Sequence, residues 1–194
     1  MLLYGGFAMT KNTKKWNIDN VLIDAVDENK YYVAKYALEN GANPNIKIRE
    51  YGSTPLMNIQ KDNLAMAKLI VKHGADINFT CDNGFTALIS SSSAGDIKIV
   101  NYLLRLGADV NSKTNDGWTA LFYASIKGHI NIVKSLIDSG ALIDIKDDNG
   151  KTPFEYAMSS KHYEVANLLV KNGARVSVYE LKKMLIFLEE DRKK

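Results

Sequence analysis

The side chains best suited to chemistry in this sequence are three histidines, one cysteine and a scatter of aspartates. His129 and His162 stand 33 residues apart, and His73 lies in the last turn of a predicted helix. The chain repeats with this 33-residue period, so the two histidines are equivalent residues of successive repeats. Such residues lie about 10 Å apart, the scale of helix packing, which is too far for shared ligation of zinc. The sequence therefore predicts no metal site. It also contains no glycine-rich phosphate loop and no metalloprotease motif.

The remaining polar groups have structural explanations. Asp147 and Asp148 fall at a predicted hairpin tip, where aspartate favours turns. The serines at 90–93 fall in a predicted helix that needs small side chains for close packing. The sequence also shows no Cys-His pair of the kind that nucleophilic catalysis uses. We expect a protein that is not an enzyme and that uses no cofactor.

The elements that position these residues repeat along the chain. Apolar residues occur seven, four and three residues before a Gly-Ala dipeptide, which is the spacing of one helix face. Glycine fits the end of such a helix because it reaches the left-handed conformation without steric cost. A fixed period of this length indicates stacked repeats rather than a globular enzyme domain. The dipeptide occurs five times, always 33 residues apart, at Gly41, Gly74, Gly107, Gly140 and Gly173.

A second motif precedes four of these helices and is typical of a helix start. Each copy has a glycine two residues before a threonine, at Thr54, Thr86, Thr119 and Thr152. A threonine hydroxyl can accept hydrogen bonds from the free amides of the first helical turn. The polar stretch before each copy suits a tight hairpin. Each repeat is therefore predicted to be a hairpin followed by two helices.

Three further motifs, Gly128-His129, Leu103-Leu104 and Gly107-Ala108-Asp109-Val110-Asn111, make the repeat resemble the ankyrin repeat. The resemblance runs from about residue 20 to residue 174. It implies an all-α solenoid with short β-hairpin loops, built from about five repeats that end near residues 42, 75, 108, 141 and 174. The histidine that the family carries in the first-helix motif is replaced throughout, so we expect apolar contact in place of its hydrogen bond. The replacements are Met57, Ile89, Phe122 and Glu155.

The N-terminal end of the array departs from the repeat. Residues 20–25 fit a first helix, but no hairpin signal precedes them, so the first unit is predicted to be a helical pair that caps the stack. Residues 1–15 are predicted to form a flexible tail. Residues 16–194 are predicted to form a single repeat domain.

The C-terminal end is predicted to close the stack with one more helix. Ser177 and Glu180 have the spacing of a capping box, which places the start of a capping helix that we expect over residues 177–192. Such a helix would cover the apolar end of the last repeat and turn its charges to water. The face expected to be buried carries Leu181, Leu185 and Leu188.

The second repeat contains a shift that cancels within it. Gly41 and Thr54 are 13 residues apart where the following repeats have 12, and Thr54 and Gly74 are 20 apart where the others have 21. We expect a hairpin longer by one residue at 46–53 and a tighter turn between the helices near 61–63. A neutral insertion in a surface loop is the favoured interpretation, since loop lengths drift readily. The alternative is a hairpin tip reshaped around Arg49, Glu50 and Tyr51.

The composition restricts the possible partners. The chain has 194 residues, 46% of them hydrophobic, and no apolar run long enough to span a bilayer. The net charge is +3, with basic and acidic residues interspersed rather than gathered into the stripe that nucleic-acid binding requires. The single cysteine, Cys81, excludes an internal disulfide, and the cytoplasm is the default location. We expect a monomer that binds no nucleic acid.

The resemblance implies that hairpin tips and first helices line a concave face on which partners bind. The residue before the repeated threonine is aromatic in two adjacent repeats, at Phe85 and Trp118. Exposed aromatic side chains of this kind are candidate anchors for a partner. The alternative is that both rings lie flat on neighbouring hairpins and shield the stack. The predicted binding residues are Tyr51, Asn83, Phe85, Asp116, Trp118, Asp148 and Lys151.

These observations favour a non-catalytic protein–protein interaction module that binds an unidentified protein on this face. An exported bacterial effector or a regulatory inhibitor with the same surface is the alternative. Binding of nucleic acid or an anionic surface through scattered lysines is a third hypothesis, and a steep loss of binding with salt would support it. An enzyme with chemistry in an irregular segment is disfavoured, because no insertion exceeds a residue or two.

Overall fold

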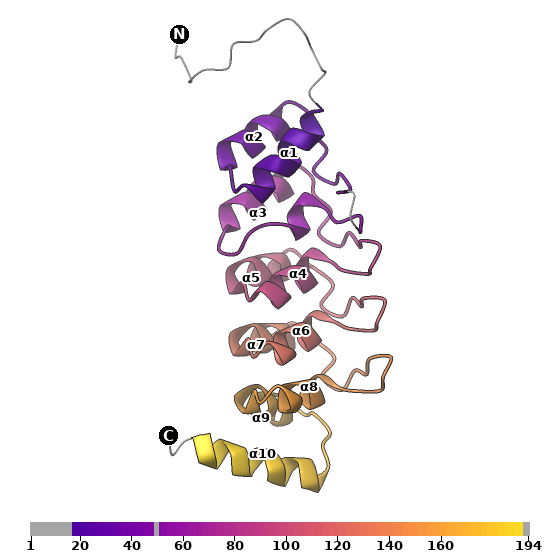
Figure 1. Cartoon of the computed structure of the whole chain (residues 1–194), viewed down its shortest axis with the longest axis vertical. Helices are drawn as coiled ribbons and strands as arrows, with labels where there is room; N and C mark the ends of the chain where they lie inside the picture. The colour runs from indigo at the N-terminus through magenta and orange to yellow at the C-terminus, as the bar shows by residue number, and fades with distance from the viewer. Residues whose placement is uncertain (1–16, 49–50, 192–194) are drawn as a thin grey trace, which may run out of the picture.

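The structure is a computed structural model that describes residues 17–48 and 51–191. In these ranges the helices are stacked mostly in pairs along the long axis of the molecule, with α1 and α2 at one end and α10 at the other (Figure 1). The tail predicted at 1–15 lies outside the described residues. The helices are α1 Ile18–Asp27, α2 Tyr31–Glu39, η1 Pro55–Met57, α3 Leu64–Lys72, α4 Ala87–Ala94, α5 Ile97–Arg105, α6 Ala120–Ile126, α7 Ile130–Asp138, α8 Pro153–Ser159, α9 Tyr163–Lys171 and α10 Val178–Asp191.

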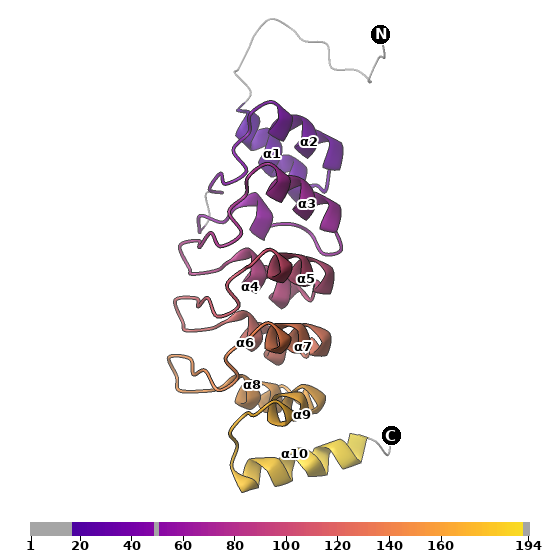
Figure 2. The same cartoon turned by 180° about the vertical axis from the view of Figure 1, so that it is seen from behind.

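The helices form two rows, and the prediction of an all-α repeat solenoid is confirmed. The first helices of the repeats are α1, η1, α4, α6 and α8, and the second helices are α2, α3, α5, α7 and α9. Seen from either side, the hairpins project from the same edge of the stack (Figure 2). We call the surface formed by the hairpin tips and the first helices the hairpin face.

The second helices end in the way that the Gly-Ala period predicts. Gly107 takes a φ of 86°. Its amide donates to the carbonyl of Leu104, and the amide of Ala108 donates to the carbonyl of Leu103, both at 3.1 Å. This pair of bonds satisfies two carbonyls that the helix leaves free at its end. A side chain at Gly107 would meet open space, so the residue is required for its backbone conformation alone.

The predicted capping role of the threonines holds for only half of them. The hydroxyl of Thr86 accepts from the amide of Ile89, and Thr152 forms a capping box with Glu155. Thr54 and Thr119 are buried at the same helix starts but make no side-chain cap bond. At these two positions the threonine contributes its extended backbone conformation and its small volume.

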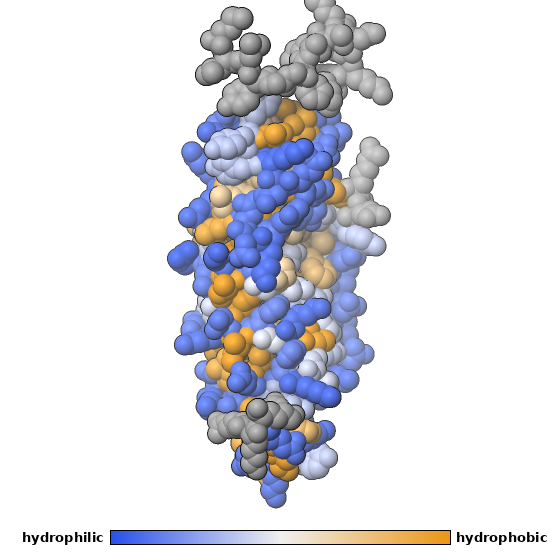
Figure 3. Space-filling model, turned by 60° about the vertical axis from the view of Figure 1, so that its left-hand side comes forward, coloured by the Kyte–Doolittle hydropathy of each residue, from blue (hydrophilic) through white to orange (hydrophobic). Residues whose placement is uncertain are grey.

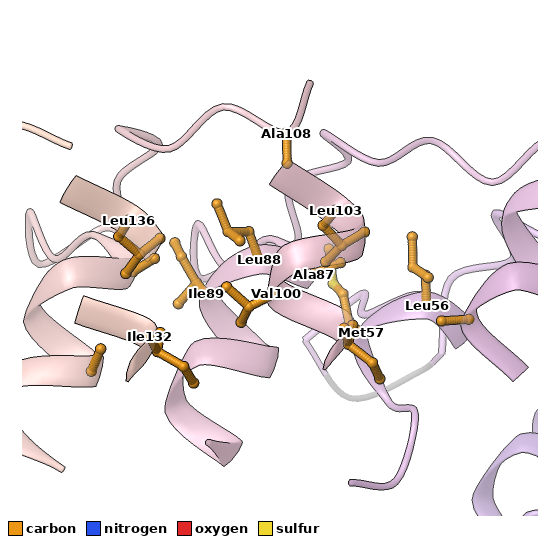
Figure 4. Packing of buried hydrophobic residues seen from close by; sticks show 14 of the residues in the cluster. Leu56, Met57, Ala87, Leu88, Ile89, Val100, Leu103, Ala108, Ile132 and Leu136 are labelled. Atoms are coloured by element: carbon orange, nitrogen blue, oxygen red, sulfur yellow. The ribbon is translucent and has the colours of Figure 1, made fainter. Parts of the chain in front are cut away.

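The repeats are held together by a continuous apolar core. Leu88, Ile89, Val100 and Leu103 of the third repeat are almost fully buried. Figure 4 shows them between side chains of the repeats on either side, with Leu56 towards one neighbour and Leu136 towards the other. Of the residues that replace the family's histidine, Met57, Ile89 and Phe122 are buried apolar contacts as expected. The fourth, Glu155, is half-buried and serves in the capping box instead.

A ladder of side chains joins successive hairpins. In Asn111, the carbonyl oxygen accepts from the Leu142 amide at 2.9 Å, while the amide group donates to the Gly140 carbonyl at 3.2 Å. Equivalent side chains accept from the segment that follows the next second helix, at Asn45, Asn78, Asn111 and Asp144. Neighbouring hairpins also approach closely, because Gly84 has no side chain where a Cβ would lie 2.7 Å from the backbone of Thr114.

The second repeat departs from the predicted pair of helices. Its first helix is reduced to the single 3₁₀ turn η1, in which the Met57 amide donates to the Thr54 carbonyl at 2.9 Å. The position that carries a serine or alanine in the other repeats is here Ile59, whose branched side chain fits a close-packed helix poorly. The tight turn expected near 61–63 is present, with Asp62 at a φ of 67°. Two of the residues named for a reshaped hairpin tip, Arg49 and Glu50, lie outside the described residues.

The terminal helix α10 begins with the capping box of Ser177 and Glu180. Its buried face differs from the expected one, because Met184 is fully buried whereas Leu185 is 47% exposed. At about 100° per residue, Leu181, Met184 and Leu188 share one face, and Leu185 lies at the edge of that face, on the side away from Met184. Phe187 extends that face and stacks on Tyr163 of α9, with ring centroids 4.6 Å apart.

Candidate partner-binding face

Trp118 is the centre of an aromatic cluster on the hairpin face. Its indole ring is half-buried and lies 5.7 Å from the ring of Phe122, 5.1 Å from that of Tyr123 and 4.7 Å from that of Tyr156, between ring centroids. The first two partners belong to its own repeat, and Tyr156 belongs to the next. Aromatic pairs at such distances stabilise a fold beyond the apolar area that they bury. The ring therefore joins repeats four and five.

A buried aspartate anchors this cluster. Asp147 is only 5% exposed, and its carboxylate accepts four hydrogen bonds. The indole N–H of Trp118 donates to Oδ2 at 3.1 Å, and the hydroxyl of Tyr156 donates to the same oxygen at 2.7 Å. The backbone amides of Asn149 and Lys151 donate to Oδ1 at 3.0 and 2.8 Å. A buried charge is tolerated only when it is satisfied in this way.

The hydrogen bonds set the ionisation of both partners. Burial alone would raise the pKa of the Asp147 carboxyl, but the bonds from Tyr156, the Lys151 amide and Trp118 outweigh burial and lower it. The same carboxylate, together with burial, raises the pKa of the Tyr156 phenol to about 12. At neutral pH the pair is therefore an ionised acceptor and a neutral donor.

Phe85 extends the cluster into the neighbouring repeat. Its half-buried ring lies 5.3 Å from that of Tyr123, which in turn contacts Trp118. Phe85, Tyr123, Trp118 and Tyr156 thus form one continuous aromatic row across repeats three, four and five. Burial and the nearby Asp116 carboxylate raise the pKa of the Tyr123 phenol, which keeps this ring neutral. The rings pack on first-helix side chains and keep one edge at the surface.

A hollow of about 250 Å³ lies at the end of this row, between the hairpins of repeats two and three. It brings together three of the predicted binding residues, Tyr51, Asn83 and Phe85. Tyr51 is 63% exposed and takes a φ of 64°. Its carbonyl accepts from the Asp82 amide at 2.9 Å, which fixes the hairpin of repeat two against that of repeat three.

The other predicted residues lie further along the hairpin face. Asp116 and Asp148 are exposed at adjacent hairpin tips, where the Asp148 amide donates to the Asp116 carbonyl at 3.4 Å. Lys151 is exposed, and its Nζ lies 5.7 Å from the centre of the Tyr156 ring, within the range of a cation–π contact. These residues form the polar border of the aromatic row and do not line the hollow.

Comparison with protein families agrees with this architecture. A family model described as ankyrin repeats, in three copies, matches residues 22–114 and residues 106–180, which together exceed half of the chain. The chain belongs to the ankyrin-repeat family. Among curated individual proteins, no match was found. Ankyrin repeats are in general protein–protein interaction modules.

Three residues of this ankyrin-repeat protein were not predicted for the site. Tyr123 and Tyr156 complete the aromatic row, and Asp147, interpreted from sequence as a turn former, is its buried acceptor. The 33-residue period contained a signal for the last of these, because it equates Asp147 with Thr114 and Cys81. A charged side chain where the neighbouring repeats carry small ones is the departure that would have identified it.

Two histidine rings pack against glycines of the preceding repeat. The ring of His129 lies against Gly95 and that of His162 against Gly128, where an added Cβ would come within 2.7 and 2.5 Å of the respective ring. Neither imidazole makes a side-chain cap bond. Within residues 17–48 and 51–191, no three histidine, cysteine or acidic residues lie close enough together to hold a metal ion.

A larger hollow, about 550 Å³, lies away from the hairpin face. Its lining comes from α9, the turn before it, the turn between α6 and α7, the start of α7 and Leu188 of α10. It includes the charged residues Lys161, Glu164 and Lys171. The side of the molecule away from the hairpins shows apolar residues only in small patches separated by hydrophilic ones (Figure 3). No helix in the described part of the chain is both long enough and apolar enough to cross a membrane.

Proposed function

We propose that this ankyrin-repeat protein binds a partner protein through its hairpin face and performs no catalysis itself. The observation that carries the proposal is the unbroken aromatic row from Phe85 to Tyr156, which stays partly exposed across three repeats. Aromatic side chains dominate the energetic centres of protein interfaces. The border of Asp116, Asp148 and Lys151 supplies the polar rim that such interfaces have. A resident scaffold, an exported effector and an inhibitor would all use this surface.

The test reverses charge on the face without touching the aromatic row. Partners would be captured with the full chain, identified by mass spectrometry and then measured with purified protein. We expect Asp116→Lys combined with Asp148→Lys to weaken partner binding by tenfold or more, since rim charges set orientation and association rate. The melting temperature should stay unchanged, because both side chains are exposed.

The matched control reverses two exposed charges on the second-helix side, Asp138→Lys with Glu164→Lys. The control should bind the partner as the wild type does. Equal binding by wild type and the hairpin-tip variant, or equal loss in both variants, would contradict the proposal. Loss of binding with rising salt that is the same for every variant would favour the anionic-surface hypothesis instead.

A further inference from the structure

Two positions of the repeat determine whether the hairpin face is filled at each junction between repeats. One is the residue before the repeated threonine, and the other lies four residues after that threonine in the next repeat. Between repeats four and five these positions are Trp118 and Tyr156, whose ring centroids are 4.7 Å apart. Between repeats three and four they are Phe85 and Tyr123, at 5.3 Å. Both junctions are closed by a pair of aromatic rings that the chain itself supplies.

The junction between repeats two and three lacks such a pair. Here the two positions are Ser53 and Ser90, and both line the 250 Å³ hollow. The position of the buried acceptor Asp147 is occupied by Cys81, which lines the hollow as well. The hollow therefore lies where the repeat places aromatic rings at the next two junctions.

The lining of the hollow selects the chemistry of its occupant. None of the described residues around it is charged, so a lysine, arginine or carboxylate side chain would be buried without a partner charge. The lining includes two aromatic side chains, Phe85 and Tyr51, and two amide side chains that can form hydrogen bonds, Asn58 and Asn83. Its volume is below the roughly 300 to 1,000 Å³ of sites for small-molecule ligands. One large, uncharged side chain matches these properties.

We propose that this hollow receives a single aromatic side chain of the partner protein, which completes the row begun by Phe85. The inference rests on the proposed function of the hairpin face and adds the chemistry of the partner at one point of it. The incoming ring lies beside Phe85 and takes the place that Tyr123 and Tyr156 occupy at the next two junctions. The partner therefore continues an arrangement that the protein makes internally.

The repeat supplies its own blocking variant. Ser90→Tyr introduces at this junction the residue that repeats four and five carry at the same position. Its ring is expected to fill the hollow as Tyr123 fills the next junction, so the variant should fold and melt at the wild-type temperature or above. Ser53→Trp, which copies Trp118 into the second repeat, is a second blocking variant in case the first does not fold. Ser139→Tyr, at an exposed position after α7, adds the same side chain away from the hairpin face and is the control.

The direct test titrates the full chain with N-acetylphenylalanine amide and N-acetyllysine amide while backbone amide resonances are followed by NMR. We expect saturable shifts around Ser53, Cys81 and Ser90 with the aromatic probe in the wild type and in Ser139→Tyr. Binding should be at least tenfold weaker in Ser90→Tyr and in the wild type with the lysine probe. Equal binding of both probes, or unchanged binding in the blocking variants, would overturn the inference.

The captured partner separates this inference from the function on which it rests. A partner that is lost with the charge reversals at the hairpin tips and also with Ser90→Tyr supports both. A partner that is lost with the reversals but binds Ser90→Tyr normally leaves the proposed function standing and overturns the role of the hollow. A partner that binds both variants as it binds the wild type contradicts the proposed function itself.

Discussion

The junction between repeats four and five and the junction between repeats two and three carry different side chains at the same positions of the hairpin face. The first forms one packed cluster in which Trp118 and Tyr156 share the carboxylate of Asp147. The second has Ser53 and Ser90 at the equivalent aromatic positions, and an open hollow lies beside them. The same repeat thus closes one junction with an aromatic pair of its own and lacks that pair at the other. The filled junction stabilises the fold while its rings stay partly exposed, and we propose that the hollow of the open junction takes a side chain of the partner.

The largest difference between the two junctions should appear when the aromatic pair of the filled junction is removed. Trp118→Ala removes three ring contacts and leaves Asp147 without one of its donors. We expect a loss of about 3 kcal/mol in the free energy of unfolding, the lower end of the range for tryptophan because the ring is half-buried. Urea denaturation followed by circular dichroism measures it. Ser53→Ala, at the same position of the open junction, should change stability by less than about 0.5 kcal/mol. Similar losses in both variants would show that the junctions do not differ.

A second variant removes the charge at the centre of the filled junction. Asp147→Asn keeps the shape of the side chain but replaces an ionised acceptor, and we expect a cost of about 2 kcal/mol at pH 7. Asp148→Asn changes the exposed neighbour and should be nearly neutral.

The pH dependence of Asp147→Asn follows from the lowered pKa of the wild-type carboxyl. The folded protein releases this proton more readily than the unfolded chain, whose carboxyl has a pKa of about 3.9. The stabilisation is therefore complete above about pH 5 and is lost as the pH falls through the folded pKa. Denaturation curves from pH 7 to pH 3 should show the difference between wild type and variant shrinking with acid. A constant difference would mean that the charge contributes nothing.

The smallest effect should be the same in repeat three, which borders the open junction, and in repeat four, which borders the filled one. Equal effects would confine the difference between the two junctions to the hairpin face. Ser92 and Ser125 are equivalent residues of repeats three and four, fully buried, with hydroxyls that have no hydrogen-bond partner in the described structure. Ser92→Ala and Ser125→Ala should each stabilise the fold by about 1 kcal/mol, because the unpaired hydroxyl is removed. Thermal melts of the two variants measure this. Ser159→Ala, which loses an exposed hydroxyl bonded to the Glu155 carbonyl, serves as the control and should not be stabilised.

The sequence predicted the parts of the fold that depend on backbone conformation and period. Gly107 and its equivalents each follow an amphipathic helix face. A glycine at that position indicates a helix end, because it readily adopts the left-handed conformation that commonly ends helices. The 3₁₀ turn at Pro55–Met57 could not be predicted in the same way. The second repeat has one residue fewer between Thr54 and Gly74 and carries Ile59 in place of a small residue. Neither change by itself indicates in the sequence that a whole helix is reduced to one turn, because the outcome depends on packing between repeats.

The candidate site was predictable in its location and less so in its composition. The position before the repeated threonine identified Phe85 and Trp118, but their state of burial depends on rings that come from other elements. Asp147 required a comparison of equivalent positions, since aspartate at a hairpin tip has an ordinary explanation. Leu185 was predicted to be buried and is not, because Met184 and Leu185 flank the Leu181–Leu188 stripe on opposite sides and the sequence does not show which side contacts α9.

The ladder through Asn45 and Asn111 joins each hairpin to the next through bonds between residues 29 or 31 positions apart. Loops of this length close rapidly, so folding can begin at any well-packed pair of repeats and spread one repeat at a time. We expect the nucleus to form around Trp118, where the junction is most tightly held. The second repeat, with a single 3₁₀ turn, should order last and open first. Amide protons of α3 should therefore exchange with solvent before those of α7.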